Sequence, residues 1–136
     1  MKISATIKNG FQVNDISVAN EGRQKKIVVP AKDVGFCSSV NGGELLFLSL
    51  ATCFCNDVYR EADKRNVNIT SVEVSVSGEF GKEGEPASNI IYTVRVQSPT
   101  LSDKEITELI SHVDKIAEVH NTLRKGVSVT LHTETA

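Results

Sequence analysis

The chain has 136 residues and a formal net charge of −2, a length that suits one domain, predicted here over residues 1–136. It has no run of five like charges, and Lys25-Lys26 is the longest basic patch, which argues against nucleic acid or a membrane surface as a partner. The longest apolar stretch, Leu45–Cys55, is shorter than the roughly 20 residues that span a bilayer. Because Met1–Ala5 also lacks an apolar signal core, we expect a cytoplasmic protein.

The first thirty residues have the pattern of an antiparallel meander. Apolar and polar residues alternate over Ile3–Ile7, as they do in a half-buried strand. Asn9-Gly10 is a strong hairpin turn. A second strand is expected over Phe11–Val18 and a third over Lys25–Val29.

A long helix is predicted to begin after Asn41 and to run to about Arg65. Asn41 has the form of an N-cap, and Glu44 stands three residues later as its reciprocal partner in a capping box. The first half of the helix is almost wholly apolar, and a helix that is apolar all round must be buried all round. We therefore expect it to be the central element. Beyond Asn56 the pattern is amphipathic, and its polar face is predicted to carry Asp57, Arg60, Glu61 and Lys64.

The second half of the chain alternates between strand and helix patterns. Val72–Phe80 and Ile91–Val96 have the period of strands and form a predicted hairpin. A second capping box, Ser102–Glu105, opens a helix that is followed by a short helix or turn ending at Gly126. Val127–Leu131 is predicted as a final strand. The order of these elements predicts an α+β fold with a mostly antiparallel sheet.

Three cysteines are the first candidates for chemistry. An odd number of cysteines in a reducing compartment argues against a disulfide framework and leaves buried or reactive thiols. Cys53 is either an inert core residue or a shielded nucleophile, and reactivity would require a nearby cation or hydrogen-bond donor. Cys55 points to the opposite side of the helix and is interpreted as a core residue. A Cys37–Cys53 disulfide is left open by the sequence.

Three further residues have ordinary structural explanations. Glu44 is accounted for by the capping box, although it could equally orient an arginine. Arg23 follows a glycine turn among polar residues, where a solvated side chain is the default. His120 is a lone histidine near the end of the second helical region. Since the sequence contains no CxxC, no HExxH and no Cys/His pair at zinc spacing, no metal or other cofactor is predicted.

The segment Asn41–Phe54 resembles the N-P-E-E-L-L-x-x-A-x-A-x-C motif of the OsmC/Ohr family, which comprises osmotically inducible protein C and the organic hydroperoxide resistance proteins. Arg65–Gly78 is similar to the family's helix-exit and strand pattern. The resemblance implies an OsmC-like fold in which antiparallel sheets pack around a long buried central helix. It also implies an intertwined homodimer with two active sites at the subunit interface.

The resemblance further implies thiol-dependent reduction of hydroperoxides, preferably organic ones, without haem, flavin or metal. Cys53 matches the family's peroxidatic cysteine, Glu44 its helix-entry glutamate, and Arg23 its active-site arginine. A guanidinium near the sulfur of Cys53 would favour the thiolate, and a carboxylate could hold that guanidinium in a bidentate pair.

The chain departs from the family where a second cysteine resolves the sulfenic acid. In Ala117–Leu123, His120 stands in the place of that cysteine and Asn121 replaces the following proline; at the helix entry, Gly42-Gly43 replaces Pro-Glu. If His120 lay near Cys53, it could stabilise the thiolate as an imidazolium or act as a base.

Three routes remain without the second cysteine. An external thiol could reduce the sulfenic acid, Cys37 or Cys55 could substitute, or the protein is no longer a peroxidase. The first hypothesis is thus a one-cysteine peroxidase that acts on a small-molecule hydroperoxide and uses an external thiol reductant. The second is a protein of the same fold that binds a small apolar or acyl ligand, with Cys53 as a structural remnant. A third is a thiol-based activity on another electrophile.

Overall fold

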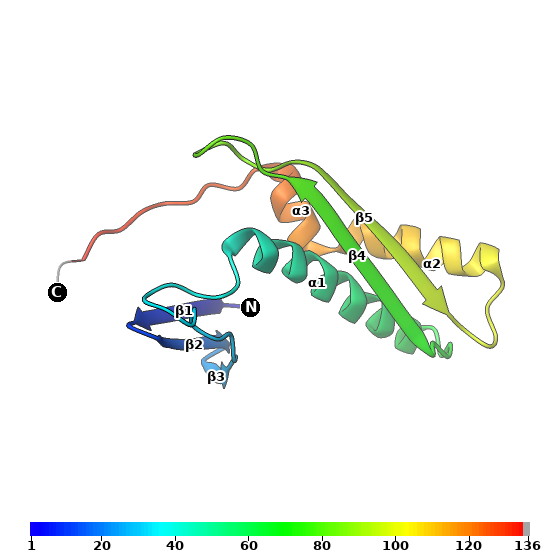
Figure 1. Ribbon diagram of the computed structural model, residues 1–136. Helices are drawn as coiled ribbons and strands as arrows, with labels where there is room; N and C mark the ends of the chain where they lie inside the picture. Colours follow the sequence, from blue (N-terminus) through cyan, green and yellow to red (C-terminus); the bar gives the residue numbers. More distant parts are fainter. Residues whose placement is uncertain (135–136) are drawn as a thin grey trace. The chain divides into compact units, whose positions relative to one another are not determined.

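The computed structural model describes residues 1–134 of the chain (Figure 1). The chain forms two compact units, Met1–Leu45 and Leu46–Ala136. The prediction of a single domain over residues 1–136 concerns how these units fold together and stays a prediction. No helix among the described residues is both long enough and apolar enough to cross a membrane.

The first unit contains a three-stranded antiparallel sheet in the order β1-β2-β3, which confirms the predicted meander. Its strands are β1 (Ile3–Gly10), β2 (Val13–Asn20) and β3 (Arg23–Lys26). The first turn lies two residues later than predicted, because Gly10 pairs with Val13 across a two-residue loop. The third strand begins earlier and ends earlier than the expected range Lys25–Val29.

The second unit consists of one hairpin and three helices. The long helix α1 (Gly42–Lys64) continues into it from the first unit. The hairpin strands are β4 (Ser71–Glu79) and β5 (Ser88–Gln97), followed by α2 (Asp103–Ile116) and α3 (Glu118–Lys125). The two sheets and three helices confirm the α+β class with antiparallel pairing.

One face of the hairpin is apolar and carries the core. Val72 pairs with Val96 and Val74 with Val94 across the strands, and side chains two residues apart lie on the same face of a strand. Helices α1 and α2 pack against this face (Figure 1). The buried residues of the resulting cluster are Phe54, Val58, Val96, Leu109, Val113 and Ala117.

The helix ends follow the predicted capping signals. At α2, the Ser102 side chain accepts from the backbone N–H of Glu105 and the Glu105 side chain accepts from the N–H of Ser102. Ala117 has an extended backbone with ψ of 103° and separates α2 from α3. Gly126 adopts the left-handed conformation with φ of 60° and ends α3, as glycine does at many helix ends.

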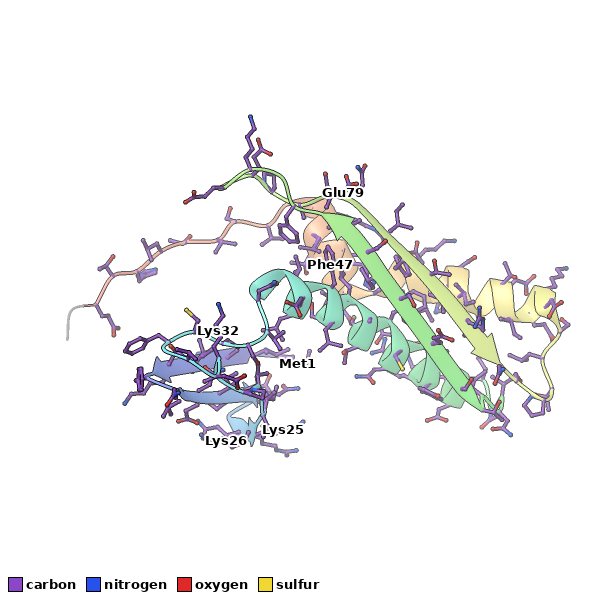
Figure 2. All side chains as sticks on the ribbon, in the orientation of Figure 1. Met1, Lys25, Lys26, Lys32, Phe47 and Glu79 are labelled. Carbon is purple, nitrogen blue, oxygen red and sulfur yellow. The ribbon has the colours of Figure 1, made fainter. Side chains whose placement is uncertain are left out.

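A close approach near the start of α1 requires glycine in β4. Phe47 extends from α1 toward the end of β4 (Figure 2), where its ring lies 5.8 Å from that of Phe80. A Cβ at Gly78 would meet the Phe47 ring at 2.7 Å and the side chain of Ile90 at 3.2 Å. The small residue therefore lets α1 pack directly on the hairpin.

Helix α1 is buried on one side only, so the expectation of burial all round is wrong for this chain. Leu50 is fully buried, whereas Leu45 and Leu48 are 38% and 59% exposed. The physical reason is that the hairpin and α2 cover a single stripe of α1.

Two carboxylates predicted on the polar face of α1, those of Asp57 and Glu61, are instead buried. Glu61 accepts a hydrogen bond from Lys64 Nζ at 2.8 Å and lies 3.1 Å from the ring of His112. Because a buried charge is tolerated when it is paired, these contacts let an acid face the core side of the helix.

The final strand predicted over Val127–Leu131 is also wrong. Residues 127–134 carry no strand or helix and extend beyond α3 (Figure 1). Val129 is 98% exposed and Leu131 88%. A strand requires a partner for its backbone N–H and C=O groups, and no strand of the described residues pairs with this segment.

Candidate functional site

Cys53 is a residue of α1, in the part of that helix that belongs to the second unit, and its side chain lies near the start of α3. Its side chain is half-buried and packs against the core cluster. The thiol is placed to donate to Oδ2 of Asp57, at 3.8 Å, one helical turn further along α1. The backbone N–H of Val119, in the first turn of α3, favours the thiolate form. N–H groups of a first helical turn lack partners within the helix, so this donor is free to act on the sulfur.

The charges around Cys53 oppose thiolate formation. Burial raises the pKa of the Cys53 thiol, and the backbone N–H of Val119 lowers it. The carboxylates of Asp57 and Glu118 raise the pKa further, since each repels a negative sulfur. Taken together, these groups of the second unit raise the pKa of Cys53 above its ordinary value. Near neutral pH these surroundings therefore favour a protonated thiol.

Asp57 is the buried member of this group. Arg60 contacts it through a guanidinium nitrogen 2.9 Å from Oδ1. Burial nevertheless raises the pKa of Asp57, and Arg60 opposes this shift. The Cys53 sulfur and the carboxylates of Asp57 and Glu118 lie within 4.8 Å of one another. They are the only such group of potential metal ligands in residues 1–134, and Asp57 already has its cation in Arg60.

The other two cysteines lie in different surroundings, and all three are free. Cys55 faces a shallow depression beside Val74 of β4. Cys37 is exposed in the first unit and has a left-handed backbone with φ of 91°. Cys53 and Cys55 form no disulfide within the helix.

Glu44 occupies its capping position. The backbone N–H of Glu44 donates to Oδ1 of Asn41 at 2.8 Å, and Oε1 of Glu44 accepts from the backbone N–H of Asn41 at 3.4 Å. Arg23 begins β3 and is exposed beside Asn20 and Lys25. It forms no ion pair within the described part of the chain. The roles of Glu44 and Arg23 as supports for Cys53 stay predictions.

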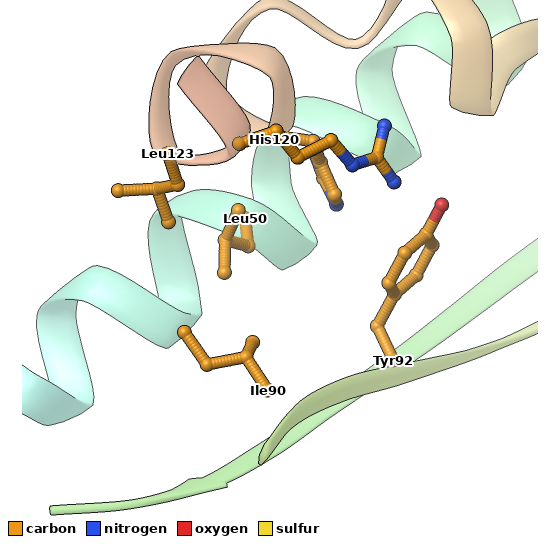
Figure 3. Close-up of a pocket in the computed structure, with 6 residues that line it drawn as sticks. Leu50, Ile90, Tyr92, His120 and Leu123 are labelled. Carbon is orange, nitrogen blue, oxygen red and sulfur yellow. The ribbon is translucent and has the colours of Figure 1, made fainter. Parts of the chain in front are cut away.

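His120 lies in a cavity of the second unit rather than among the groups that shift the Cys53 pKa (Figure 3). Its ring is 4% exposed and is held edge-to-face by two aromatic rings, with centroids 4.7 Å from Tyr92 and 5.7 Å from Phe54. Burial lowers the pKa of His120, and so does the charge of Arg124. The predicted role as base for Cys53 stays a prediction.

An ion-pair network borders the same cavity. Asp114 of α2 accepts a hydrogen bond from the hydroxyl of Tyr92 and lies 2.6 Å from Nη2 of Arg124. Burial and the nearby carboxylate raise the pKa of Tyr92 to about 12. Arg124 also donates to the backbone carbonyl of Asp114 at 3.0 Å. This network ties α3 to α2 and β5.

Sequence reasoning missed the acids beside Cys53 and the cavity around His120. Asp57 carried a usable signal, because residues four apart share one face of a helix. The sequence contains no signal for Glu118 or Tyr92, since their positions depend on how α3 and β5 pack.

The sequence profile of the family described as OsmC-like protein matches residues 35–132. The chain belongs to this family. No curated protein is found to match the chain.

Solved structures of the family share the fold. An OsmC-like protein from Mycoplasma pneumoniae is 22% identical, with a TM-score of 0.61 over 90% of this chain and 86% of that one. An OsmC-like protein from Vibrio cholerae is 14% identical, with a TM-score of 0.63 over 90% of this chain and 93% of that one. The organic hydroperoxide resistance protein OhrB of Bacillus subtilis is 20% identical, with a TM-score of 0.54 over 91% of each chain.

The buried imidazole predicts a loss of stability as the pH falls from 7 to 5. The unfolded histidine takes up a proton near its ordinary pKa of about 6.5, whereas folding lowers the pKa of His120. The unfolded state therefore binds more protons in this range, and the free energy of unfolding decreases with falling pH. Urea unfolding at pH 7 and pH 5 measures this loss. His120→Phe should reduce it, and His132→Phe, at an exposed histidine, should not. An unchanged loss in His120→Phe contradicts the prediction.

The acids around Cys53 predict that removing one charge makes the thiol more reactive. Glu118→Gln removes an exposed carboxylate that raises the Cys53 pKa. Alkylation of Cys53 by iodoacetamide at pH 7.5 should then accelerate by about two- to fivefold, the scale expected for an exposed charge. The rate is measured by mass spectrometry of the peptide that contains Cys53. Glu83→Gln, in the hairpin loop, is the matched control and should leave the rate unchanged. Equal rates in the two variants would argue against a charge effect of Glu118.

Proposed function

We propose that this chain reduces organic hydroperoxides through the thiol of Cys53. The observation that carries the proposal is the position of that thiol, half-buried on α1 opposite a free backbone N–H of α3. Membership of the OsmC-like family supports the proposal. It is further supported by the likeness in fold to proteins described as organic hydroperoxide resistance proteins, from Bacillus subtilis and Legionella pneumophila.

In the proposed reaction, the thiolate of Cys53 attacks the terminal oxygen of the hydroperoxide. The S–O bond forms as the O–O bond breaks, and the alkoxide takes a proton and leaves as the alcohol. The sulfur is oxidised to a sulfenic acid and the peroxide is reduced. One external thiol then condenses with the sulfenic acid and releases water. A second external thiol displaces the first as a disulfide and restores the thiol of Cys53.

The external thiol is favoured over Cys55 as the group that reduces the sulfenic acid. Cys55 lies on another side of α1, against the depression beside Val74. A disulfide between Cys53 and Cys55 would require α1 to unwind locally, because a disulfide brings its two Cα atoms to within about 7 Å with converging side chains.

The proposal requires a positive charge that the second unit does not supply to the sulfur. Asp57 and Glu118 both raise the Cys53 pKa, and only the Val119 N–H opposes them. We propose that Arg23 supplies this charge and that Glu44 orients it. We therefore expect Arg23→Ala to retain the fold and to lose hydroperoxide reduction.

We also propose that the functional form is a homodimer. Apolar side chains of the single chain remain exposed on both units, including Ile3 at 63%, Leu48 at 59% and Val129 at 98%. The hairpin β4–β5 also leaves both of its strand edges unpaired within the described residues. Two-stranded sheets are marginally stable alone, and exposed strand edges pair readily with another chain. A second copy would cover such surfaces.

The peroxidase proposal is tested by the rate of thiol loss in reduced protein mixed with cumene hydroperoxide. Wild-type protein, Cys37→Ser and Cys55→Ser should lose one thiol rapidly, and Cys53→Ser should not. A dimedone adduct on Cys53, detected by mass spectrometry, should report the sulfenic acid. Turnover should then require an added small thiol, because His120 stands where the family's second cysteine would be.

A rate no faster than that of a simple free thiol would overturn the proposal. It would leave the alternative of a ligand-binding protein in which Cys53 is a structural remnant. The upward shift of the Cys53 pKa is the observation that keeps this alternative in view.

The homodimer predicts a molar mass in solution of about twice 14.8 kDa. Light scattering coupled to gel filtration measures it. Val129→Asp should shift the mass toward the monomer, because it puts a charge among the exposed apolar side chains of Val127, Val129 and Leu131, which we propose that a second copy covers. Thr130→Asp puts the same charge at a polar position outside this apolar set and should leave the dimer intact. A monomer at micromolar concentration in wild-type protein would contradict the proposal.

A further inference from the structure

A cavity of about 220 Å³ lies in the second unit, between α1, β5 and α3 (Figure 3). Its lining is mainly apolar. Figure 3 shows the aliphatic side chains of Leu50, Ile90 and Leu123 around the space, with the Tyr92 ring on one side and His120 above it. Ile90 and Leu123 are partly exposed, so the cavity opens to the surface between them.

The cavity contains one polar side chain whose hydrogen bonds are not met by the protein. His120 is 96% buried, and neither ring nitrogen has a partner among the described residues. A buried polar group without a hydrogen bond costs free energy. A neutral imidazole presents one N–H donor and one acceptor nitrogen. A hydroxyl group can either accept from the first or donate to the second.

The cavity has no free charge with which to attract an ion. Arg124 lines it, but the guanidinium is paired with Asp114 at 2.6 Å. The Tyr92 hydroxyl donates to the same carboxylate. Burial keeps His120 neutral by lowering its pKa. Because the guanidinium of Arg124 is already neutralised by Asp114, the cavity offers no unpaired charge to an anionic or a cationic ligand.

We propose that the cavity beside His120 binds a small uncharged molecule with an apolar body and one hydroxyl group. The apolar body would contact Leu50, Ile90 and Leu123, and the hydroxyl would hydrogen-bond the imidazole. The volume is suitable for a substituted benzene ring, since a cavity of about 150 Å³ lined by apolar side chains accommodates benzene. This inference goes beyond the proposed peroxidase function, because none of its contacts involves Cys53.

The test is a titration of ¹⁵N-labelled protein with 4-methylphenol, toluene and 4-methylbenzoate, followed by NMR of the histidine rings and the backbone. We expect 4-methylphenol to bind saturably, to shift the ring signals of His120, and to bind about three- to tenfold more tightly than toluene, the effect of one hydrogen bond. The benzoate should bind more weakly than 4-methylphenol.

Two histidine variants separate the hydrogen bond from packing. His120→Phe keeps a ring between Phe54 and Tyr92 and should bring the affinities for 4-methylphenol and toluene together. His112→Phe makes the same change at the histidine beside Glu61 and should leave the difference in place. If His120→Phe does not fold, Leu123→Trp fills the mouth of the cavity from an exposed position and should abolish binding.

Three results would overturn the proposal. Equal affinities of wild-type protein for 4-methylphenol and toluene would mean that His120 makes no bond to the ligand. Tighter binding of 4-methylbenzoate would mean an anion site at Arg124. Absence of saturable binding would mean that water or side-chain packing alone satisfies the imidazole. Cys53→Ser should bind 4-methylphenol as the wild type does, so the fate of this inference is separate from that of the peroxidase proposal.

Discussion

The packing of one stripe of α1 against the β4–β5 hairpin and α2 is the constraint on which the described chemistry depends. Phe54 is its centre: the side chain is fully buried, and its ring contacts those of Tyr92 and His120. The residue before it, Cys53, is thereby held at the edge of the core near the first turn of α3. One turn earlier, Leu50 forms a wall of the cavity. A single packing arrangement thus places both the thiol and the cavity.

The environment of Cys53 balances one donor against two acids. The N–H of Val119 stabilises the thiolate, whereas Asp57, Glu118 and burial favour the neutral thiol. The peroxidatic role that we propose for Cys53 requires an ionised thiol, and the charges of the second unit do not favour that form. The acids give a physical reason for activation to depend on a cation that arrives from elsewhere. Without such a cation, burial and the two acids keep the thiol of Cys53 neutral, and a neutral thiol is a poor nucleophile.

Local signals in the sequence predicted most of the elements, and non-local contacts explain the errors. The capping boxes at Asn41 and Ser102 and the stop at Gly126 use residues within one turn, so they could be identified without a fold. The cavity around His120 could not, because its walls come from α1, β5 and α3. The prediction that Asp57 lies on a polar face of α1 is wrong for a related reason. Periodicity shows which residues share a face, but packing decides which face is covered.

Two predictions that required burial are wrong, one for α1 and one for Val127–Leu131. They have the same cause, and it concerns how the chain assembles. Period-two apolar patterns, as in Val127–Leu131, are selected by burial on one face of a sheet, yet these residues have no strand partner within residues 1–134. The apolar first half of α1 likewise exceeds what one hairpin and one helix cover. Exposed apolar residues that occur singly need no explanation, but exposed residues that keep the spacing of a strand or helix face do. A second copy would supply both a strand edge and a covering layer, and the homodimer that we propose rests on this shared requirement of α1 and the C-terminal segment.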